Sequence, residues 1–299
     1  MSWMPISRRA LLLQVTAFVA FAGAGVAQDA ERVLSIGGSV TEIVHALGQG
    51  DRLIARDTTS TFPPKAAELP DVGYARALSP EGVLSVAPTL ILTIEGAGPP
   101  ETIEVLRQSG VDMVTIPEAQ SAAGIVEKIA AVGEALGVPE RAEALISETS
   151  AALEAAEART AQVPMEARKR VLFILSLQGG RILASGRDTQ ASAIIEMAGG
   201  VNAVTEFEGY KQMTDEAVAQ AAPDVILMMD RSGDHAVADE QLFALPAIRT
   251  TPAGDTESVL RMGGLYLLGF GPRTAQAALD LNAALYGQEG TAPDDRDPS

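Results

Sequence analysis

The chain has 299 residues, of which 47% are hydrophobic, and a formal net charge of −17 at pH 7. This length and hydrophobic content suit one large or two medium folded domains, and the acidic surface argues against nucleic acid or anionic membranes as partners. There is no cysteine, which excludes disulfides, thiolate metal sites, thiol nucleophiles and a lipidated N-terminal cysteine.

Residues 1–27 have the pattern of a cleaved leader peptide. Arg8 and Arg9 form its charged part, residues 10–22 are apolar, and residues 25–27 (GVA) form a small-x-small cleavage site. The apolar stretch is short for a membrane span, although an uncleaved anchor is the alternative. The paired arginines fit either a general or a twin-arginine export route. We therefore expect a periplasmic protein without a lipid anchor or stable membrane insertion.

Residues 31–136 alternate short apolar runs with amphipathic segments. Strands are predicted at 33–36, 51–55, 89–94 and 112–116, with helices ending at Leu47 and Ser109. Strands that alternate with helices indicate a mostly parallel α/β sheet. This stretch is the predicted N-terminal lobe.

Residues 137–165 are predicted to connect two lobes. After a break at Gly137-Val138-Pro139, alanine, glutamate and leucine dominate, which predicts one long helix over about 140–161. A helix of that length spans about 30 Å. Because such a connection is stiff, we expect little closure of the lobes on ligand binding.

Residues 166–288 restart the α/β pattern and form the predicted C-terminal lobe. Strands are predicted at 170–177 and 182–184, and a last helix at 272–286. Residues 289–299 are polar and proline-rich and are predicted to be a disordered tail. The predicted fold is α/β, with two Rossmann-like lobes, each a mostly parallel sheet flanked by helices. One long helix joins the lobes, and a ligand cleft lies between them.

A repeated segment relates the two lobes. Residues 73–92 read GYARALSPEGVLSVAPTLIL, and residues 209–227 read GYKQMTDEAVAQAAPDVIL. From Leu78 and Met213 onward the copies align without a gap, at an offset of 135 residues. This period is too long for a solenoid repeat. It indicates two similar lobes, each presenting one tyrosine and one glutamate.

The segment SIGGSVTEIVHALG at 35–48 resembles the opening strand and helix of the periplasmic binding proteins that serve iron-complex and cobalamin ABC importers. The repeated segments resemble the haem-binding branch of that family, and the resemblance covers about residues 31–288. It implies a protein that captures haem (haem b, as haemin) and delivers it to the permease dimer of an inner-membrane ABC importer. We expect a monomer.

The resemblance implies that Tyr74 is the ligand of the ferric haem iron. Phenolate is a hard anionic oxygen donor and a known axial ligand of haem. Arg76, two residues later, suits either charge support for the phenolate or a forked contact with a haem propionate. The alternative is that Tyr74 is an ordinary loop residue and Arg76 a solvated charge.

The second lobe supplies further candidates. Tyr210 matches Tyr74 and is a candidate second ligand, a ring stacked on the porphyrin, or a loop residue. Candidate partners for the haem propionates are Lys211, Arg187 and Arg261. The alternative is that these three are ordinary cations exposed to solvent. His235 follows a strand that ends at Asp230, and such loops border the ligand crevice of α/β sheets. Candidates for apolar contact with the porphyrin, all equally suited to the core, are Met213, Met229 and Met262.

Glu81 and Glu216 occupy equivalent places in the two copies, in the first turn of a predicted helix. The resemblance implies that each forms salt bridges with one permease subunit; as ordinary first-turn carboxylates they would simply complement the helix dipole. Cobalamin and a ferric siderophore are the alternative ligands. An enzyme is disfavoured because no GxSxG or HExxH motif is present.

Overall fold

The computed structural model describes Met1 and residues 31–230 and 237–287. The predicted leader, the C-terminal tail and His235 lie outside the described residues. Residues 31–230 and 237–287 belong to one compact unit.

The N-terminal lobe is built on a four-stranded sheet in which every pair is parallel, in the order β2-β1-β3-β4. The strands are β1 (Val33–Ile36), β2 (Leu53–Arg56), β3 (Leu90–Ile94) and β4 (Asp112–Ile116). Its helices are α1 (Gly38–Ala46), α2 (Pro64–Ala67), α3 (Pro80–Ser85), α4 (Pro100–Gln108) and α5 (Ala122–Ala135), with a 3-10 turn at Gly50–Arg52.

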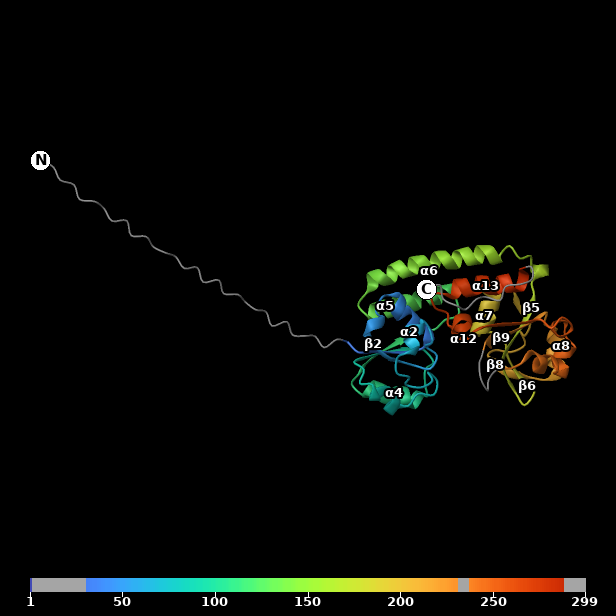
Figure 1. The fold of residues 1–299 in the computed structure, drawn as a ribbon, viewed down its shortest axis with the longest axis horizontal. Helices are drawn as coiled ribbons and strands as arrows, with labels where there is room; N and C mark the ends of the chain where they lie inside the picture. Colours follow the sequence, from blue (N-terminus) through green and yellow to red (C-terminus); the bar gives the residue numbers. More distant parts are fainter. Residues whose placement is uncertain (2–30, 231–236, 288–299) are drawn as a thin grey trace. The chain divides into compact units, whose positions relative to one another are not determined.

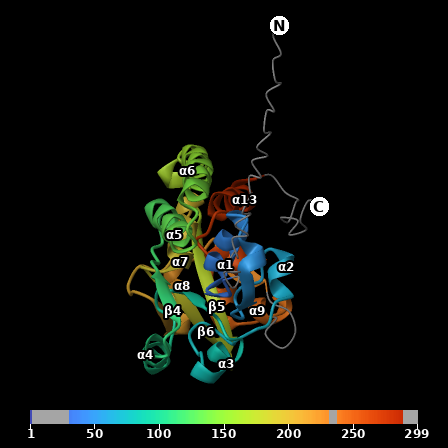
Figure 2. The ribbon, with the colours of Figure 1, turned by 90° about the vertical axis from the view of Figure 1, so that its left-hand side faces the viewer.

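The alternation along β3 shows how this sheet is packed on both faces. Leu90 and Leu92 belong to the core shared with α1 and α5, whereas Ile91 belongs to the core under α3 and α4. Successive side chains of a strand point to opposite faces, so one buried strand contributes to both cores. Figure 2 shows α5 and α6 on one side of the strands and α3 and α4 on the other.

The C-terminal lobe contains a mixed sheet in the order β10-β9-β5-β6-β8, with β7 pairing β5. The strands are β5 (Arg170–Gln178), β6 (Arg181–Ser185), β7 (Val201–Asn202), β8 (Tyr210–Met213), β9 (Val225–Asp230) and β10 (Val259–Gly263). The pairs among β10, β9, β5 and β7 are parallel, whereas β6 pairs antiparallel with both β5 and β8.

Short helices cover both faces of this sheet. They are α7 (Gln190–Met197), α8 (Asp215–Ala221), α9 (Asp239–Phe243), α10 (Pro246–Arg249), α11 (Pro252–Asp255), α12 (Gly264–Leu268) and α13 (Thr274–Tyr286), with a 3-10 turn at Met165–Ala167. Side chains of α7, α12 and α13 join the core on one face, and those of α8 to α11 form the core on the other.

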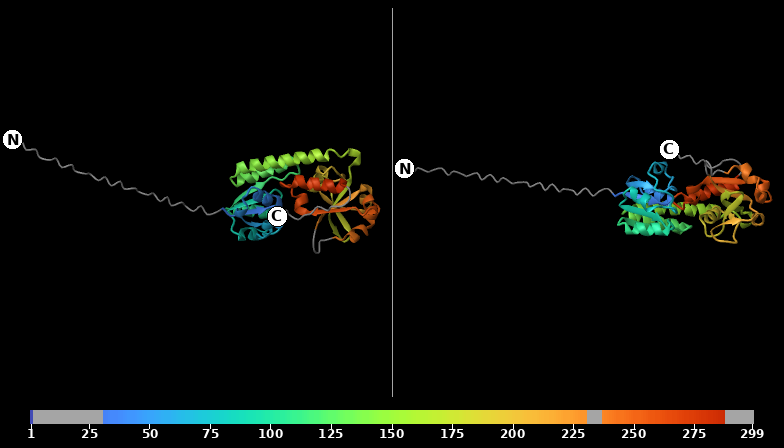
Figure 3. Two further views of the ribbon diagram at one scale, coloured as in Figure 1. Left: turned by 45° about the horizontal axis from the view of Figure 1, so that its top comes forward. Right: turned by 90° about the horizontal axis from the view of Figure 1, so that it is seen from below.

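The predicted connecting helix is present as α6 (Pro139–Thr160), 22 residues long. It packs against α5 at one end and α13 at the other, and Figures 1 and 3 show it running along both halves of the structure. The core on this side is continuous: Val44 and Ile129 of the first lobe belong to the same buried cluster as Phe173 and Leu281 of the second.

Two buried charged side chains, Lys128 and Glu42, contact the second lobe where α1 and α5 meet the segment between α12 and α13. Lys128 is 0% exposed, and its Nζ lies 2.9 Å from Glu118 Oε2 and donates to the carbonyl oxygen of Phe270 at 3.0 Å. Glu42 accepts two hydrogen bonds from the Arg273 guanidinium, at 3.1 and 3.0 Å. Leaving a buried charge without its partner is costly, so the Glu42–Arg273 pair and the Lys128–Phe270 hydrogen bond oppose separation of the lobes.

Candidate functional site

The repeated segments adopt the same conformation over their helices. Ser79 Oγ accepts a hydrogen bond from the Gly82 N–H at the start of α3, and Thr214 Oγ1 accepts one from the Ala217 N–H at the start of α8. Each helix is followed by an alanine with a positive φ, 47° at Ala87 and 42° at Ala222. Residues other than glycine seldom adopt this conformation, so its presence in both copies supports a structural repeat.

Glu81 and Glu216 both lie exposed in the first turn of their helices. The pKa of Glu216 is lowered by hydrogen bonds from its own backbone N–H and from the Thr214 side chain. A solvated carboxylate at each position is free to meet a cationic partner.

Tyr74 lies on a loop that we call the Tyr74 loop (residues 71–78). Its side chain is 47% exposed, and among the residues that the structure describes its hydroxyl has no hydrogen-bond partner. The backbone on either side is held: the Tyr74 carbonyl accepts from the Ala77 N–H at 2.8 Å, and the Ala75 carbonyl accepts from the Gly98 N–H at 2.9 Å. The loop therefore presents a free phenol on an ordered backbone.

Tyr210 has a different environment, although it matches Tyr74 in the repeat. It opens the edge strand β8 and is half-buried, and its ring meets Phe173 edge to face at 6.4 Å between centroids. Burial raises the pKa of the Tyr210 phenol, against the effect of hydrogen bonds with the side chains of Thr189 and Ser185. The Thr189 and Ser185 side chains thus lie beside its hydroxyl within its own lobe.

Arg76 links the two lobes electrostatically. Its charge acts to lower the pKa of the Tyr210 phenol, in the second lobe, and also that of the Glu118 carboxyl, which burial raises. Arg76 is exposed, and within residues 31–230 and 237–287 its guanidinium forms no ion pair or hydrogen bond. Of the predicted cations it has the freest head group for an anionic ligand.

The other predicted cations already have partners. The Lys211 ammonium lies 5.3 Å from the centroid of the Phe207 ring. The Arg187 guanidinium is 3.3 Å from the exposed Glu208 carboxylate, a surface pair of the kind that contributes little and exchanges readily.

Arg261 is held more closely. Its guanidinium lies 2.6 Å from Asp239 and donates to the Val237 carbonyl at 2.8 Å. A propionate would therefore have to displace or share these contacts.

The three candidate methionines differ in how deeply they are buried. Met262 is buried in the core shared by the two lobes, and Met229 is partly buried against that core. Met213 is partly buried against the other core of the second lobe, under α8 to α11. His45 is a half-buried residue of α1 whose pKa is lowered by burial and by the nearby Lys65 charge.

Sequence reasoning missed Glu118 and its partner Lys128. Glu118 follows the C-terminal end of β4 by two residues, and the carboxyl ends of parallel strands are where ligands bind in α/β folds. That position was a usable signal. Lys128 carried none, because a lysine on an alanine-rich helix looks solvent-exposed in sequence.

Two negative findings apply to the described part of the chain. No group of three or more His, Asp or Glu side chains there is arranged to hold a metal ion. No helix among those residues has the length and apolar character needed to cross a membrane.

Solved structures of haem-binding proteins are similar to this fold. "Periplasmic heme-binding protein BhuT in complex with two hemes" is 40% identical, with a TM-score of 0.81 over 85% of this chain and 97% of that one. "Periplasmic heme-binding protein RhuT" from Roseiflexus sp. RS-1 is 36% identical, with a TM-score of 0.82 over 86% of this chain and 98% of that one.

Curated sequences are similar at lower identity. The ABC transporter substrate-binding lipoprotein YvrC of Bacillus subtilis is 28% identical over 68% of this chain, and the match spans just 65% of YvrC. The vitamin B12-binding protein of Vibrio cholerae is 27% identical over 72% of this chain and 74% of its own length.

A family model described as periplasmic binding protein matches residues 33–264, which include β1 to β10 and both repeated segments. This family consists of substrate-binding transport proteins rather than enzymes. The chain belongs to the periplasmic binding protein family.

Proposed function

We propose that this protein captures haem outside the cytoplasm and delivers it to an ABC importer. The observation that carries the proposal is the pairing, on one ordered loop, of an exposed Tyr74 whose hydroxyl is free with an exposed Arg76 whose guanidinium is free. Ferric haem accepts a phenolate oxygen as an axial iron ligand, and its propionates bind cations; this loop offers one of each.

The iron is held by Tyr74 in this proposal, and Tyr210 belongs to the opposite wall. A ligand must present its oxygen to the metal without first breaking other contacts. The exposed Tyr74 hydroxyl meets that condition, whereas the Tyr210 side chain is half-buried, with Thr189 and Ser185 beside its hydroxyl. The half-buried Tyr210 ring is suited to packing against the porphyrin.

The first proposed partner of the haem propionates is Arg76, and the next are Lys211 and Arg187. The protein is strongly acidic, with a formal net charge of −17, so a dianionic ligand needs local cations to offset the repulsion. Arg187 can exchange its surface pair at little cost. Arg261 would have to leave Asp239, so it ranks last, and His235 stays a prediction.

Cobalamin is the second candidate ligand, because the vitamin B12-binding protein of Vibrio cholerae matches this chain. Two observations favour haem. The haem-binding neighbours BhuT and RhuT share 40% and 36% identity with this chain over most of its length, against 27% for the B12-binding protein. The free phenol and guanidinium also match the iron and carboxylates of haem.

Delivery rests on Glu81 and Glu216 in this proposal. One exposed carboxylate projects from the equivalent first turn in each lobe, which fits two similar permease subunits carrying basic residues. The proposed processing removes residues 1–27 and leaves lobes at 31–136 and 166–288, a connecting segment at 137–165 and a tail at 289–299.

A ligand titration tests the proposal. Purified ligand-free protein is mixed with haemin, and separately with cyanocobalamin, and the absorbance spectrum is followed. We expect a shifted Soret band that saturates with haemin, and no binding of cyanocobalamin. Saturable cobalamin binding with an unchanged haemin spectrum would overturn the assignment of haem.

A further inference from the structure

Asp71 makes a set of contacts at the start of the Tyr74 loop. Its Oδ1 accepts a hydrogen bond from the Gly73 N–H at 2.8 Å and another from the Thr58 hydroxyl at 3.1 Å. Its Oδ2 forms an ion pair with Arg56 at 2.7 Å. One carboxylate thus ties the residue before Tyr74 to the segment that follows β2.

Gly73 is held on both sides of its backbone. In addition to the bond from its N–H to Asp71, its carbonyl accepts from the Thr58 N–H at 3.0 Å. Its φ of 105° lies in the region that only glycine adopts readily. The direction in which the chain enters Tyr74 therefore depends on an unusual backbone conformation that Asp71 and Thr58 stabilise together.

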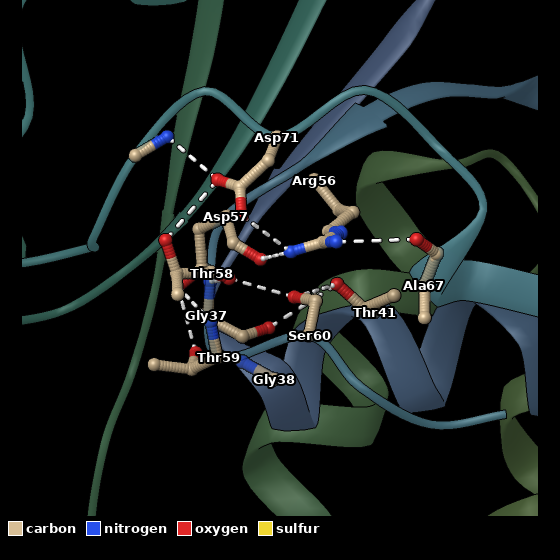
Figure 4. A network of polar contacts seen from close by, with 11 residues as sticks. Gly37, Gly38, Thr41, Arg56, Asp57, Thr58, Thr59, Ser60, Ala67 and Asp71 are labelled. Atoms are coloured by element: carbon tan, nitrogen blue, oxygen red, sulfur yellow. Dashed lines mark hydrogen bonds and ion pairs between the residues drawn. The ribbon is translucent and has the colours of Figure 1, made fainter. Parts of the chain in front are cut away.

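These contacts continue into the buried base of the lobe, as Figure 4 shows. The Arg56 guanidinium also donates to the carbonyl oxygen of Asp57 at 3.1 Å. The Asp57 side chain is fully buried and accepts hydrogen bonds from the Gly37 N–H at 2.9 Å and the Ser60 hydroxyl at 2.6 Å. The anchor of the Tyr74 loop is thus connected to the turn between β1 and α1.

We propose that Asp71 is a positioning residue for the iron ligand, which fixes the backbone of Gly73 so that the Tyr74 phenol is held in place before haem arrives. The inference rests on the proposed role of Tyr74. A group that binds metal must be held to within about half an ångström of its working position. An exposed side chain receives little support from packing, so its backbone must supply that order.

The second copy of the repeat lacks this device. The Gly209 N–H donates to the Arg187 carbonyl, and its own carbonyl accepts from the Gly186 N–H, so backbone groups alone hold the residue before Tyr210. The Tyr210 side chain gains its order from burial and from Phe173 instead. A carboxylate anchor is present in the copy whose tyrosine is exposed.

The test measures the rate of haem dissociation from the full protein by transfer to a haem scavenger. Asp71→Ala should accelerate dissociation about tenfold, the lower end of the loss seen when groups that orient metal ligands are removed. Asp71→Asn keeps an oxygen that accepts from Gly73 and should retain most of the slow rate. Asp51→Ala is the matched control, because it removes an equal charge from an exposed pair with Lys65 in the same lobe.

A double mutant separates positioning from general support of the fold. In a Tyr74→Phe background, Asp71→Ala should have no further effect on dissociation, because no phenol remains to be positioned. An equal acceleration with and without the Tyr74 hydroxyl would overturn the inference, as would a wild-type rate for Asp71→Ala. If Tyr74→Phe itself leaves dissociation unchanged, the proposed function has failed at its ligand, and the inference fails with it.

Discussion

The two copies of the repeat share a helix and differ in how they hold a tyrosine. Both helices begin with a hydroxyl cap and end before an alanine of positive φ and a proline. Tyr74, however, lies exposed on a loop, whereas Tyr210 is half-buried on an edge strand, with Thr189 and Ser185 beside its hydroxyl. Similar sequences therefore place their tyrosines in unequal environments.

In the proposed function, the two copies of the repeat share the docking role of their glutamates and differ in the role of their tyrosines. The exposed glutamates occupy equivalent positions and suit a partner with two similar halves. In the proposed function, Tyr74 supplies the phenolate for a single haem iron, while the opposite wall supplies shape and apolar surface. The predictions below test that division, starting with the contacts that hold the two copies in one unit.

Removing the charge of Lys128 should have the largest effect, which is a loss of stability of the folded protein. Lys128→Ala leaves the Glu118 carboxylate partly buried without its cation, which should reduce the free energy of unfolding by about 3–5 kcal/mol. Lys65→Ala, which breaks an exposed pair with Asp51, should change it by about 1 kcal/mol or less. Urea unfolding monitored by circular dichroism measures both, and equal small losses would contradict a structural role for Lys128.

The two tyrosines should differ strongly in haem affinity. Tyr74→Phe removes the proposed iron ligand and should weaken binding by about 100-fold or more, since removing a group that merely orients a metal ligand already costs about 10- to 100-fold. Tyr210→Phe keeps the ring and should weaken binding by about threefold or less. Haemin titration in the visible range gives both dissociation constants; comparable losses would make the two copies equivalent.

The two glutamates should behave alike. Glu81→Lys and Glu216→Lys should each reduce haem uptake into cells or vesicles that contain the importer by roughly tenfold, because a like charge facing a basic permease residue costs several kcal/mol at worst. Haem affinity should not change, because neither glutamate lies on the Tyr74 loop or on β8. Loss of uptake in one variant alone would show that the lobes dock unequally.

A small effect on stability at high pH should distinguish Tyr210. Burial raises the pKa of its phenol above the usual 10.0. Above that pH the unfolded chain releases a proton that the folded chain retains, so the free energy of unfolding falls as pH rises, by at most about 1.4 kcal/mol per pH unit for one proton. Tyr210→Phe should make this decline shallower. An unchanged slope in urea unfolding at a series of alkaline pH values would place Tyr210 in water.

Much of the fold was predictable from sequence because hydrophobic period and length mark long elements well. The strands at 33–36 and 112–116 and the long helix α6 lie within a residue or two of their predicted bounds. Strand β8 was missed, because YKQM at an edge has exposed polar residues in its middle and no apolar alternation. The helix α12 was also missed, because a segment of five residues is too short to show the hydrophobic periodicity of a helix.

The candidate site was predictable in its residues but not in its geometry. The repeat pointed to Tyr74, Arg76 and Tyr210. It gave no sign that the Tyr210 hydroxyl contacts Thr189, because that contact joins residues 21 positions apart through strand pairing. The role proposed for Asp71 could not be predicted from sequence either, because it depends on the backbone conformation of the turn at Gly73. Limited closure of the lobes stays a prediction, which the Lys128–Phe270 hydrogen bond and the Glu42–Arg273 pair between the lobes support.

The identity of the iron ligand is the central claim, and resonance Raman spectroscopy of the ferric haem complex tests it most directly. Excitation in a phenolate-to-iron charge-transfer band should give phenolate vibrations in the wild-type protein and in Tyr210→Phe, and none in Tyr74→Phe. Phenolate vibrations that survive in Tyr74→Phe and vanish in Tyr210→Phe would assign the iron to the other lobe and contradict the account.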